Sequence, residues 1–106
     1  MKSLFSIEFD FRQAIQRAEE LEGIAADMKK LADEDLETSL QSLSLVWKGE
    51  AANAYLAKGS RLKDKILKSS SDLTKSASTI RRVAKRTYDA EKKAYQIAME
   101  RNYPKG

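Results

Sequence analysis

Apolar residues recur along the first half of the chain at steps of three and four residues, the spacing that gathers side chains on one face of an α-helix. The positions are Phe11, Ile15, Ala18, Leu21, Ala25, Met28, Ala32, Leu36, Leu40 and Leu43, with Ile24 and Leu31 widening the face. This pattern predicts a helix over residues 10–45. Asp10 and Gln13 have the spacing of a helix-capping pair. Residues 7–10 alternate between apolar and acidic side chains, which favours an extended lead-in before the helix.

The second half carries a longer pattern, in which steps of four and three alternate over about six heptads. Its positions are Tyr55, Gly59, Leu62, Ile66, Ser69, Leu73, Ser76, Ile80, Val83, Thr87, Ala90, Ala94 and Ile97. We expect a helix over about residues 50–101, which ends before Pro104 because proline cannot continue it. The side chains expected to carry its contacts to another helix are Tyr55, Leu62, Ile66, Leu73 and Ile80.

The two helices, joined by a turn over residues 46–49, predict one all-α domain, 1–106: an antiparallel helical hairpin with a short C-terminal tail. One proline and four glycines supply too few turns for a β-sandwich or barrel. At about 1.5 Å per residue the second helix outruns the first, so residues 88–103 should form an overhang. Each helix is too apolar on one face to remain single, so we expect the hairpin to bind a helical partner.

The residue types exclude most catalytic chemistry. The chain has no cysteine and no histidine, so it lacks the commonest general base and the thiolate and imidazole ligands of transition metals. Asp33, Glu34 and Asp35 are consecutive and would spread around a helix instead of converging on one site. No glycine-rich phosphate loop is present. We expect a non-enzymatic protein without catalytic residues, cofactor or metal ion.

Charge is distributed unevenly. Residues 1–49 contain 6 Lys+Arg and 10 Asp+Glu, whereas residues 50–106 contain 14 and 6. Opposite charge favours pairing of the two halves or the choice of a partner. The basic second half also suggests a remote alternative, a helical nucleic-acid-binding protein. Interspersed acids and the lack of a groove-reading motif disfavour that alternative, and a narrow seam rich in Ser, Ala and Gly disfavours membrane binding.

Between the helices the sequence reads Ser44-Leu45-Val46-Trp47-Lys48-Gly49-Glu50-Ala51-Ala52. Gly49 can adopt a positive φ at no steric cost, and the Trp47 ring can close the open end of a hairpin. Any helical hairpin could use a glycine and an apolar plug in this way. However, Trp-x-Gly near the middle of a chain of this length, followed by Ala51-Ala52 and Tyr55, resembles the turn motif of the WXG100 (ESAT-6-like) family.

The resemblance covers the whole chain as architecture and implies a definite function. Members are small helical hairpins that pair as four-helix bundles and leave the cell through the type VII (ESX) secretion system without a cleaved signal peptide, often in virulence or interbacterial competition. This chain's N-terminus likewise lacks the apolar run of a signal peptide. By resemblance we expect a secreted protein, made in the cytoplasm, whose partner is a second copy, a related small helical protein or the secretion machinery.

Family members often carry an export signal of tyrosine, three residues, then aspartate or glutamate, and here the fit fails. Tyr88 is followed four residues later by Lys92, and Tyr95 by Met99; Glu91 comes one residue too early for Tyr88. We still expect Tyr88, Glu91 and Tyr95 to lie on the surface shown to the export machinery or a partner. An alternative is that the chain is an adaptor that binds the helical N-terminal domain of a larger LXG-type toxin and borrows its signal.

Overall fold

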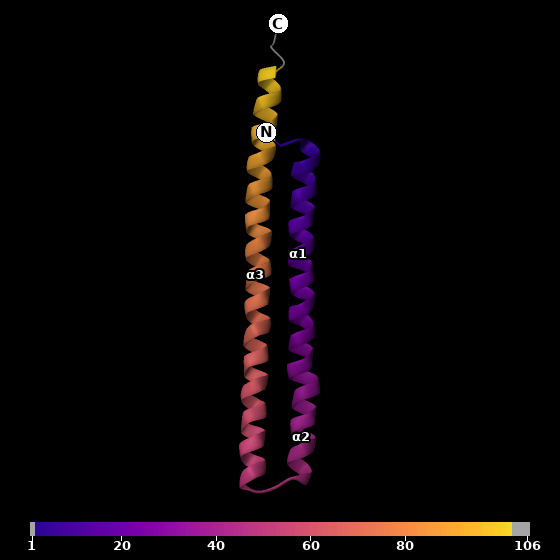
Figure 1. Ribbon diagram of the computed structural model, residues 1–106, viewed down its shortest axis with the longest axis vertical. Helices are drawn as coiled ribbons and strands as arrows, with labels where there is room; N and C mark the ends of the chain where they lie inside the picture. The colour runs from indigo at the N-terminus through magenta and orange to yellow at the C-terminus, as the bar shows by residue number, and fades with distance from the viewer. Residues whose placement is uncertain (1, 103–106) are drawn as a thin grey trace. The chain divides into compact units, whose positions relative to one another are not determined.

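The computed structural model describes residues 2–102, and all of them are helical except Lys2, Ser3, Trp47, Lys48 and Gly49. Its elements are α1 (Leu4–Lys30), the π-helical segment η1 (Leu31–Leu36), α2 (Glu37–Val46) and α3 (Glu50–Asn102), as shown in Figure 1. No strand occurs within this range. The all-α class is confirmed, and α3 begins at the residue where the sequence places the second helix.

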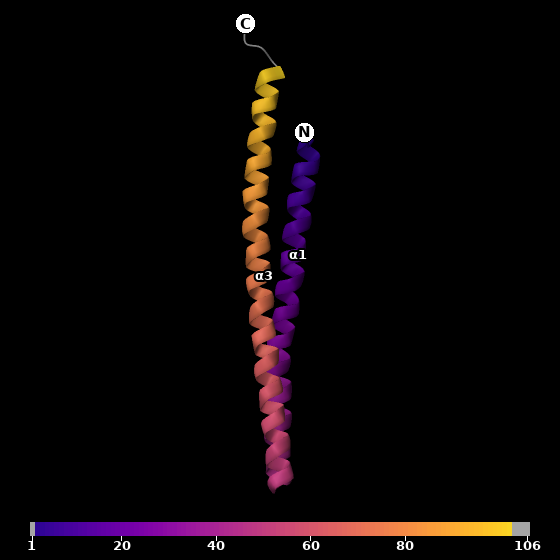
Figure 2. The ribbon, with the colours of Figure 1, turned by 60° about the vertical axis from the view of Figure 1, so that its left-hand side comes forward.

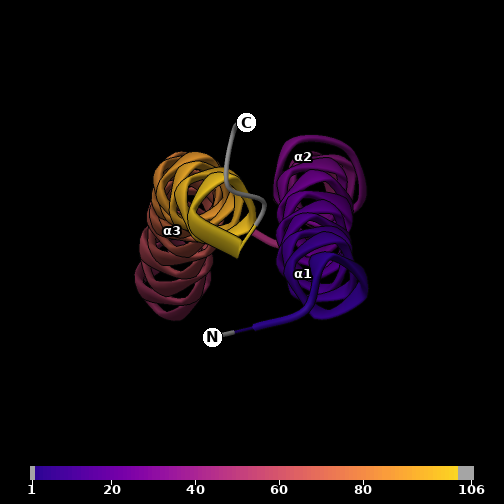
Figure 3. The same ribbon diagram turned by 90° about the horizontal axis from the view of Figure 1, so that it is seen from above.

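The contacts divide the chain into two units. The terminal unit consists of residues 1–20 and 76–106, and the turn unit of residues 21–75. In the turn unit Ser70 contacts Ala25 and Gly59 faces Leu40, so α3 runs antiparallel to the helix before it and the unit is a helical hairpin. The terminal unit is an antiparallel pair formed by the start of α1 and the second half of α3, which lie side by side in Figures 2 and 3.

The start of α1 corrects the prediction, because the helix begins at Leu4 and not at residue 10. Ser3 caps it: the Ser6 amide donates to Ser3 Oγ at 3.1 Å, and the Ile7 amide donates to the Ser3 carbonyl at 3.1 Å. The extended lead-in and the Asp10 cap are therefore wrong. Two alternating apolar residues are too few to distinguish a strand from a helix, and Ile7 in fact continues the helical stripe four residues before Phe11.

The predicted apolar stripe of the first helix is confirmed, because all ten of its positions are buried or half-buried. The fully buried side chains are nevertheless small. They are Ala18, Ala25, Ala32, Ala52 and Ala77, and Ile7 at 2% exposure is the largest of the core. Small residues at a helix–helix contact let the two backbones approach closely. The core is therefore thin, and most large apolar side chains lie outside it.

The π-helical turn of η1 lies where the spacing of the stripe changes. From Met28 the apolar positions advance by four residues three times in succession, to Ala32, Leu36 and Leu40. In an α-helix repeated steps of four rotate the stripe away from its partner, whereas the wider π turn absorbs one additional residue. Ala32 is consequently fully buried and Leu36 half-buried.

The face that α3 turns toward the preceding helix is displaced from the predicted seam. Ile66, Leu73 and Ile80 are half-buried, but Tyr55 and Leu62 are 55% and 51% exposed. These two do not contribute to the hairpin's own core. As a result, small residues lie at the contact between the helices. Ser70, Ala77 and Ala52 are buried, whereas the predicted seam would have buried Ser69, Ser76 and Tyr55. Ser70 is satisfied there, because its hydroxyl donates to the Ala25 carbonyl at 2.7 Å.

The predicted overhang is also shorter. Because α1 starts six residues earlier than expected, its first turns reach Tyr88, and Lys2 just before it reaches Glu91; both residues were expected to lie beyond the first helix. In the terminal unit only the last turns of α3 continue past the start of α1 (Figure 1). Tyr103, at the predicted end of the overhang, lies outside the described residues.

Candidate interaction surface

The chain reverses direction over Trp47, Lys48 and Gly49. The Trp47 amide donates to the Leu43 carbonyl at 3.0 Å, after which the backbone becomes extended. The Lys48 ammonium donates to the Ser44 carbonyl at 2.6 Å and so satisfies one of the free carbonyls at the end of α2. Gly49 has a φ of 110°, the only positive φ among the described residues, and its carbonyl accepts the first hydrogen bond of α3.

Trp47 packs against Tyr55, one turn into α3, with ring centroids 5.5 Å apart. Trp47 is 38% exposed, and the neighbouring Leu45 and Val46 are 76% and 81% exposed. The turn therefore carries an aromatic pair, but it does not enclose that pair or the adjacent aliphatic side chains.

Tyr88 lies in the terminal unit at the centre of contacts with the first turns of α1. Its hydroxyl donates to Glu8 Oε1 at 2.8 Å, and its ring lies 4.5 Å from that of Phe11. The Lys92 ammonium is 5.3 Å from the centroid of the Tyr88 ring and 3.7 Å from Glu8 Oε1. The pKa of Lys92 is raised above its ordinary value, chiefly by the Tyr88 hydroxyl and further by the Glu8 carboxylate.

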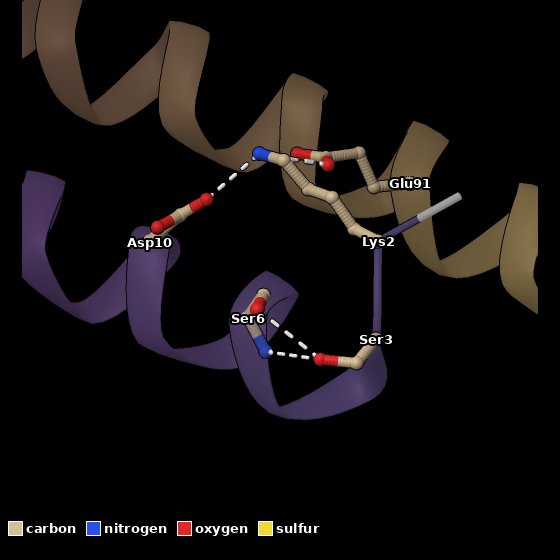
Figure 4. Close-up of polar contacts among 5 residues, drawn as sticks. All are labelled: Lys2, Ser3, Ser6, Asp10 and Glu91. Atoms are coloured by element: carbon tan, nitrogen blue, oxygen red, sulfur yellow. Dashed lines mark hydrogen bonds and ion pairs between the residues drawn. The ribbon is translucent and has the colours of Figure 1, made fainter.

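Glu91, one turn after Tyr88, is held by the segment before α1. The Lys2 ammonium lies 3.1 Å from Glu91 Oε2 and 2.7 Å from Asp10 Oδ2, so one cation joins carboxylates of two helices (Figure 4). Hydrogen bonds to Asp10 and then to Glu91 raise the pKa of Lys2. Asp10, expected as a helix cap, thus pairs with Lys2 instead.

An open, mostly apolar groove of about 400 Å³ adjoins these contacts. Ile7, Phe11, Ile80, Val83 and Thr87 line it, and so do the charged residues Lys2, Asp10 and Glu91. Val83 is 49% exposed. Tyr95 is half-buried two turns further along α3 and does not line the groove.

The structure thus brings two of the three expected surface residues, Tyr88 and Glu91, into one cluster. Sequence reasoning missed the residues that organise it: Glu8, which lies 80 positions before Tyr88, and Lys2, which lies 89 positions before Glu91. Nothing in the local pattern marks them. Phe11 belongs to the predicted apolar stripe, but its tyrosine partner could not be assigned without the register of the two helices.

Within residues 2–102 no three acidic side chains gather as a metal ion would require. None of the helices in that range combines the length and apolar character of a membrane span.

Comparison with protein-family models, curated proteins and solved structures yields no match to this chain.

Proposed function

We propose that this chain is a non-enzymatic protein that acts by helix–helix association and is exported through a type VII secretion system, either by itself or as a co-exported partner. The observation that carries the proposal is a set of apolar side chains that the hairpin leaves uncovered. Four of those in the turn unit are Ile24 in α1, Leu31 in η1, and Tyr55 and Leu62 in α3, each 48–55% exposed.

These four residues, which we call the flanking row, have the geometry of a second helix contact. The two members on the first helix, Ile24 and Leu31, are seven residues apart, and so are the two members on α3. On the first helix each member directly precedes a buried residue, Ala25 or Ala32. Seven-residue spacing is the repeat with which one helix follows another. Covering the exposed half of one such side chain contributes about 1 kcal/mol. A helical partner is therefore the occupant that the spacing suits.

The thin core supports the same proposal. The hairpin buries alanines and one serine where a self-sufficient two-helix protein would need large side chains. Helices of this length gain most of their stability from covering an apolar face, with little from intrinsic propensity. Association would supply that cover.

The type VII assignment is supported by the turn. Gly49 has the backbone conformation that favours glycine, and Trp47 and Tyr55 form an aromatic pair beside it. Those are the residues through which the sequence resembles WXG100 proteins. The test of export is secretion of the tagged chain into the medium by a bacterium with an intact type VII apparatus, compared with the same strain lacking that apparatus. Equal release by both strains would refute this assignment.

Association is tested by placing a charge in the flanking row. Leu62→Glu should weaken binding to a different partner about five-fold, because it removes about 1 kcal/mol of apolar cover, and self-association about thirty-fold, because a dimer loses that cover in both copies. The matched control is Ala57→Glu, which introduces the same charge at an exposed position of the same helix. Equal association of the two variants would show that the flanking row is not an interface.

A second candidate keeps the fold and changes the role, to an adaptor for a larger LXG-type toxin. It is favoured by the absence of an acid four residues after Tyr88 or Tyr95. Co-expression with the toxin's helical N-terminal domain distinguishes the two roles. An adaptor is exported only with that domain, whereas a self-sufficient substrate is exported alone.

A further inference from the structure

The flanking row is bordered by charges of opposite sign on the two helices of the turn unit. On α3 each member of the row is followed three residues later by an exposed lysine, Lys58 or Lys65. On the first helix the exposed acid Asp35 follows Leu31 by four residues, within the π-helical segment η1. Side chains three or four residues apart lie on the same face of a helix. The row therefore has a basic edge on α3 and an acid on the first helix.

The two borders lie on the same side of the turn unit. On α3, Leu62 directly precedes Lys63, which reaches across to Glu37. On the first helix, Asp35 directly precedes the half-buried Leu36. Because both helices are right-handed and run antiparallel, the positions just before their inward-facing residues project to one side of the hairpin. One face thus presents apolar side chains between a basic and an acidic helix edge.

Lys65 and Asp35 also stand at the same level along the hairpin. The Lys63 ammonium lies 3.0 Å from Glu37 Oε2, and two residues further along α3 and two residues back along the first helix are Lys65 and Asp35. Lys63 and Glu37 are satisfied within the hairpin. Among residues 2–102, by contrast, neither Lys65 nor Asp35 has an ion-pair partner. These two charges are therefore available to another molecule.

We infer that a second copy of this chain covers the flanking row, with α3 of each copy on the first helix of the other and Lys65 of one copy paired with Asp35 of the other. A two-fold axis parallel to the hairpin produces this arrangement, because it keeps each residue at its own level and exchanges the two helices. An axis across the hairpin would instead place α3 on α3, with lysine edge against lysine edge. Charge complementarity therefore selects the parallel axis.

This inference rests on the proposed function for helix–helix association and adds the partner and its orientation. The test exchanges the charges and measures self-association by light scattering over a concentration series at low salt, where screening is weakest. Asp35→Lys and Lys65→Glu should each weaken self-association about ten-fold, because each makes both symmetric pairs of the dimer repulsive and an exposed pair contributes little by itself.

Two combinations should restore association to the wild-type level. One is the double variant, Asp35→Lys with Lys65→Glu, which reverses both pairs and keeps their attraction. The other is an equal mixture of the two single variants, because each copy then offers the charge that the other lacks. If the double variant associates no better than the single variants, the inference is overturned.

The matched control is Lys75→Glu, which makes the same charge change at an exposed residue of the same helix and unit. Lys75 lies thirteen residues after Leu62, which places it on the opposite side of α3 from the flanking row. It should associate as wild type does. Weakening equal to that of Lys65→Glu would mean that net charge and not pairing is responsible, and the inference would be wrong.

Orientation is tested with introduced cysteines, which report only on the chosen positions because the chain has none of its own. A short bis-maleimide should join the two copies in an equal mixture of Asp35→Cys and Lys65→Cys, and should not join copies of either variant alone. Cross-linking of Asp35→Cys to itself without cross-linking in the mixture would place like helices together and overturn the inference.

The failure of this inference can be distinguished from the failure of the proposed function. A wild-type chain that remains monomeric over the whole concentration series would show that a second copy does not cover the row, which overturns the inference. Export and the binding of a different helical partner would then still decide the proposed function. Conversely, a dimer with the predicted charge dependence that is not exported would retain the inference and refute the type VII assignment.

Discussion

The close approach of the helices in the turn unit can be tested with its two helical glycines. An alanine Cβ at Gly23 would meet nothing within 4 Å, whereas at Gly59 it would lie 2.5 Å from Leu40 Cδ2 and 3.2 Å from Leu40 Cδ1. Glycine in a helix interior costs about 1 kcal/mol relative to alanine. Gly23→Ala should therefore increase the free energy of unfolding by about 1 kcal/mol.

At Gly59 the same gain is opposed by overpacking, because carbon atoms at optimal contact are about 3.5–4.0 Å apart. Forcing a methyl group into a closely packed contact costs about 1–3 kcal/mol. Gly59→Ala should accordingly be less favourable than Gly23→Ala by about 1–3 kcal/mol. In a Leu40→Ala background the obstruction is gone, and Gly59→Ala should stabilise the chain by about as much as Gly23→Ala does.

The assay is urea unfolding followed by circular dichroism at 222 nm, at one fixed protein concentration so that association contributes equally to each variant. The m-value should not change among the variants. Equal stabilisation by Gly23→Ala and Gly59→Ala in the chain that retains Leu40 would refute the reasoning, because it would mean that Leu40 and Gly59 are not in contact in solution.

Three further predictions follow from single contacts. Gly49→Ala should lower the free energy of unfolding by at least about 1–2 kcal/mol, since a φ of 110° is unfavourable for a residue with a Cβ; an unchanged urea midpoint would contradict the turn geometry. Ser70→Ala should cost about 1 kcal/mol by removing the buried hydrogen bond to the Ala25 carbonyl, and a variant that unfolds at the wild-type midpoint would show that this bond is absent. The Lys63 ammonium, 3.0 Å from Glu37 Oε2, lowers the pKa of Glu37. The stability from this pair is therefore present above the ordinary pKa of about 4.3 and lost as the pH falls through the lower folded value. Glu37→Gln should unfold at a lower temperature than wild type at pH 7, and the two should converge at pH 2; a difference that persists at pH 2 would assign the effect to another cause.

The periodicity of the sequence was sufficient for the class of the fold, because three- and four-residue spacing directly reports one face of a helix. It failed where two interpretations share residues. Ile66, Leu73 and Ile80 belong both to the predicted seam of α3, which includes Leu62, and to its observed inner face, which includes Ser70. The spacing of apolar residues alone does not decide between these two faces. The size of the side chains on the facing helix decides, because its alanines favour the face with small residues, which lets the two backbones approach.

The candidate surface was harder to predict from the sequence. Tyr88 and Glu91 stand out as an aromatic and an acid on one helix, but their partners Glu8 and Lys2 depend on where α1 begins. Because Ser3 caps α1, the helix begins six residues earlier than predicted, and its N-terminal turns lie alongside Tyr88. The run of four-residue steps from Met28 to Leu40 was a readable sign of the π turn, which an ideal α-helical period overlooks.

The central claim, that the hairpin requires a helical partner, is tested most directly by the solution mass of the chain alone, measured by light scattering over a concentration series with unfolding followed in parallel. We predict a species of about twice the 12.0 kDa chain mass, or a chain that folds cooperatively only when a helical partner is added. A 12.0 kDa monomer that unfolds cooperatively with a midpoint independent of concentration would contradict the account, because the flanking row would then need no cover.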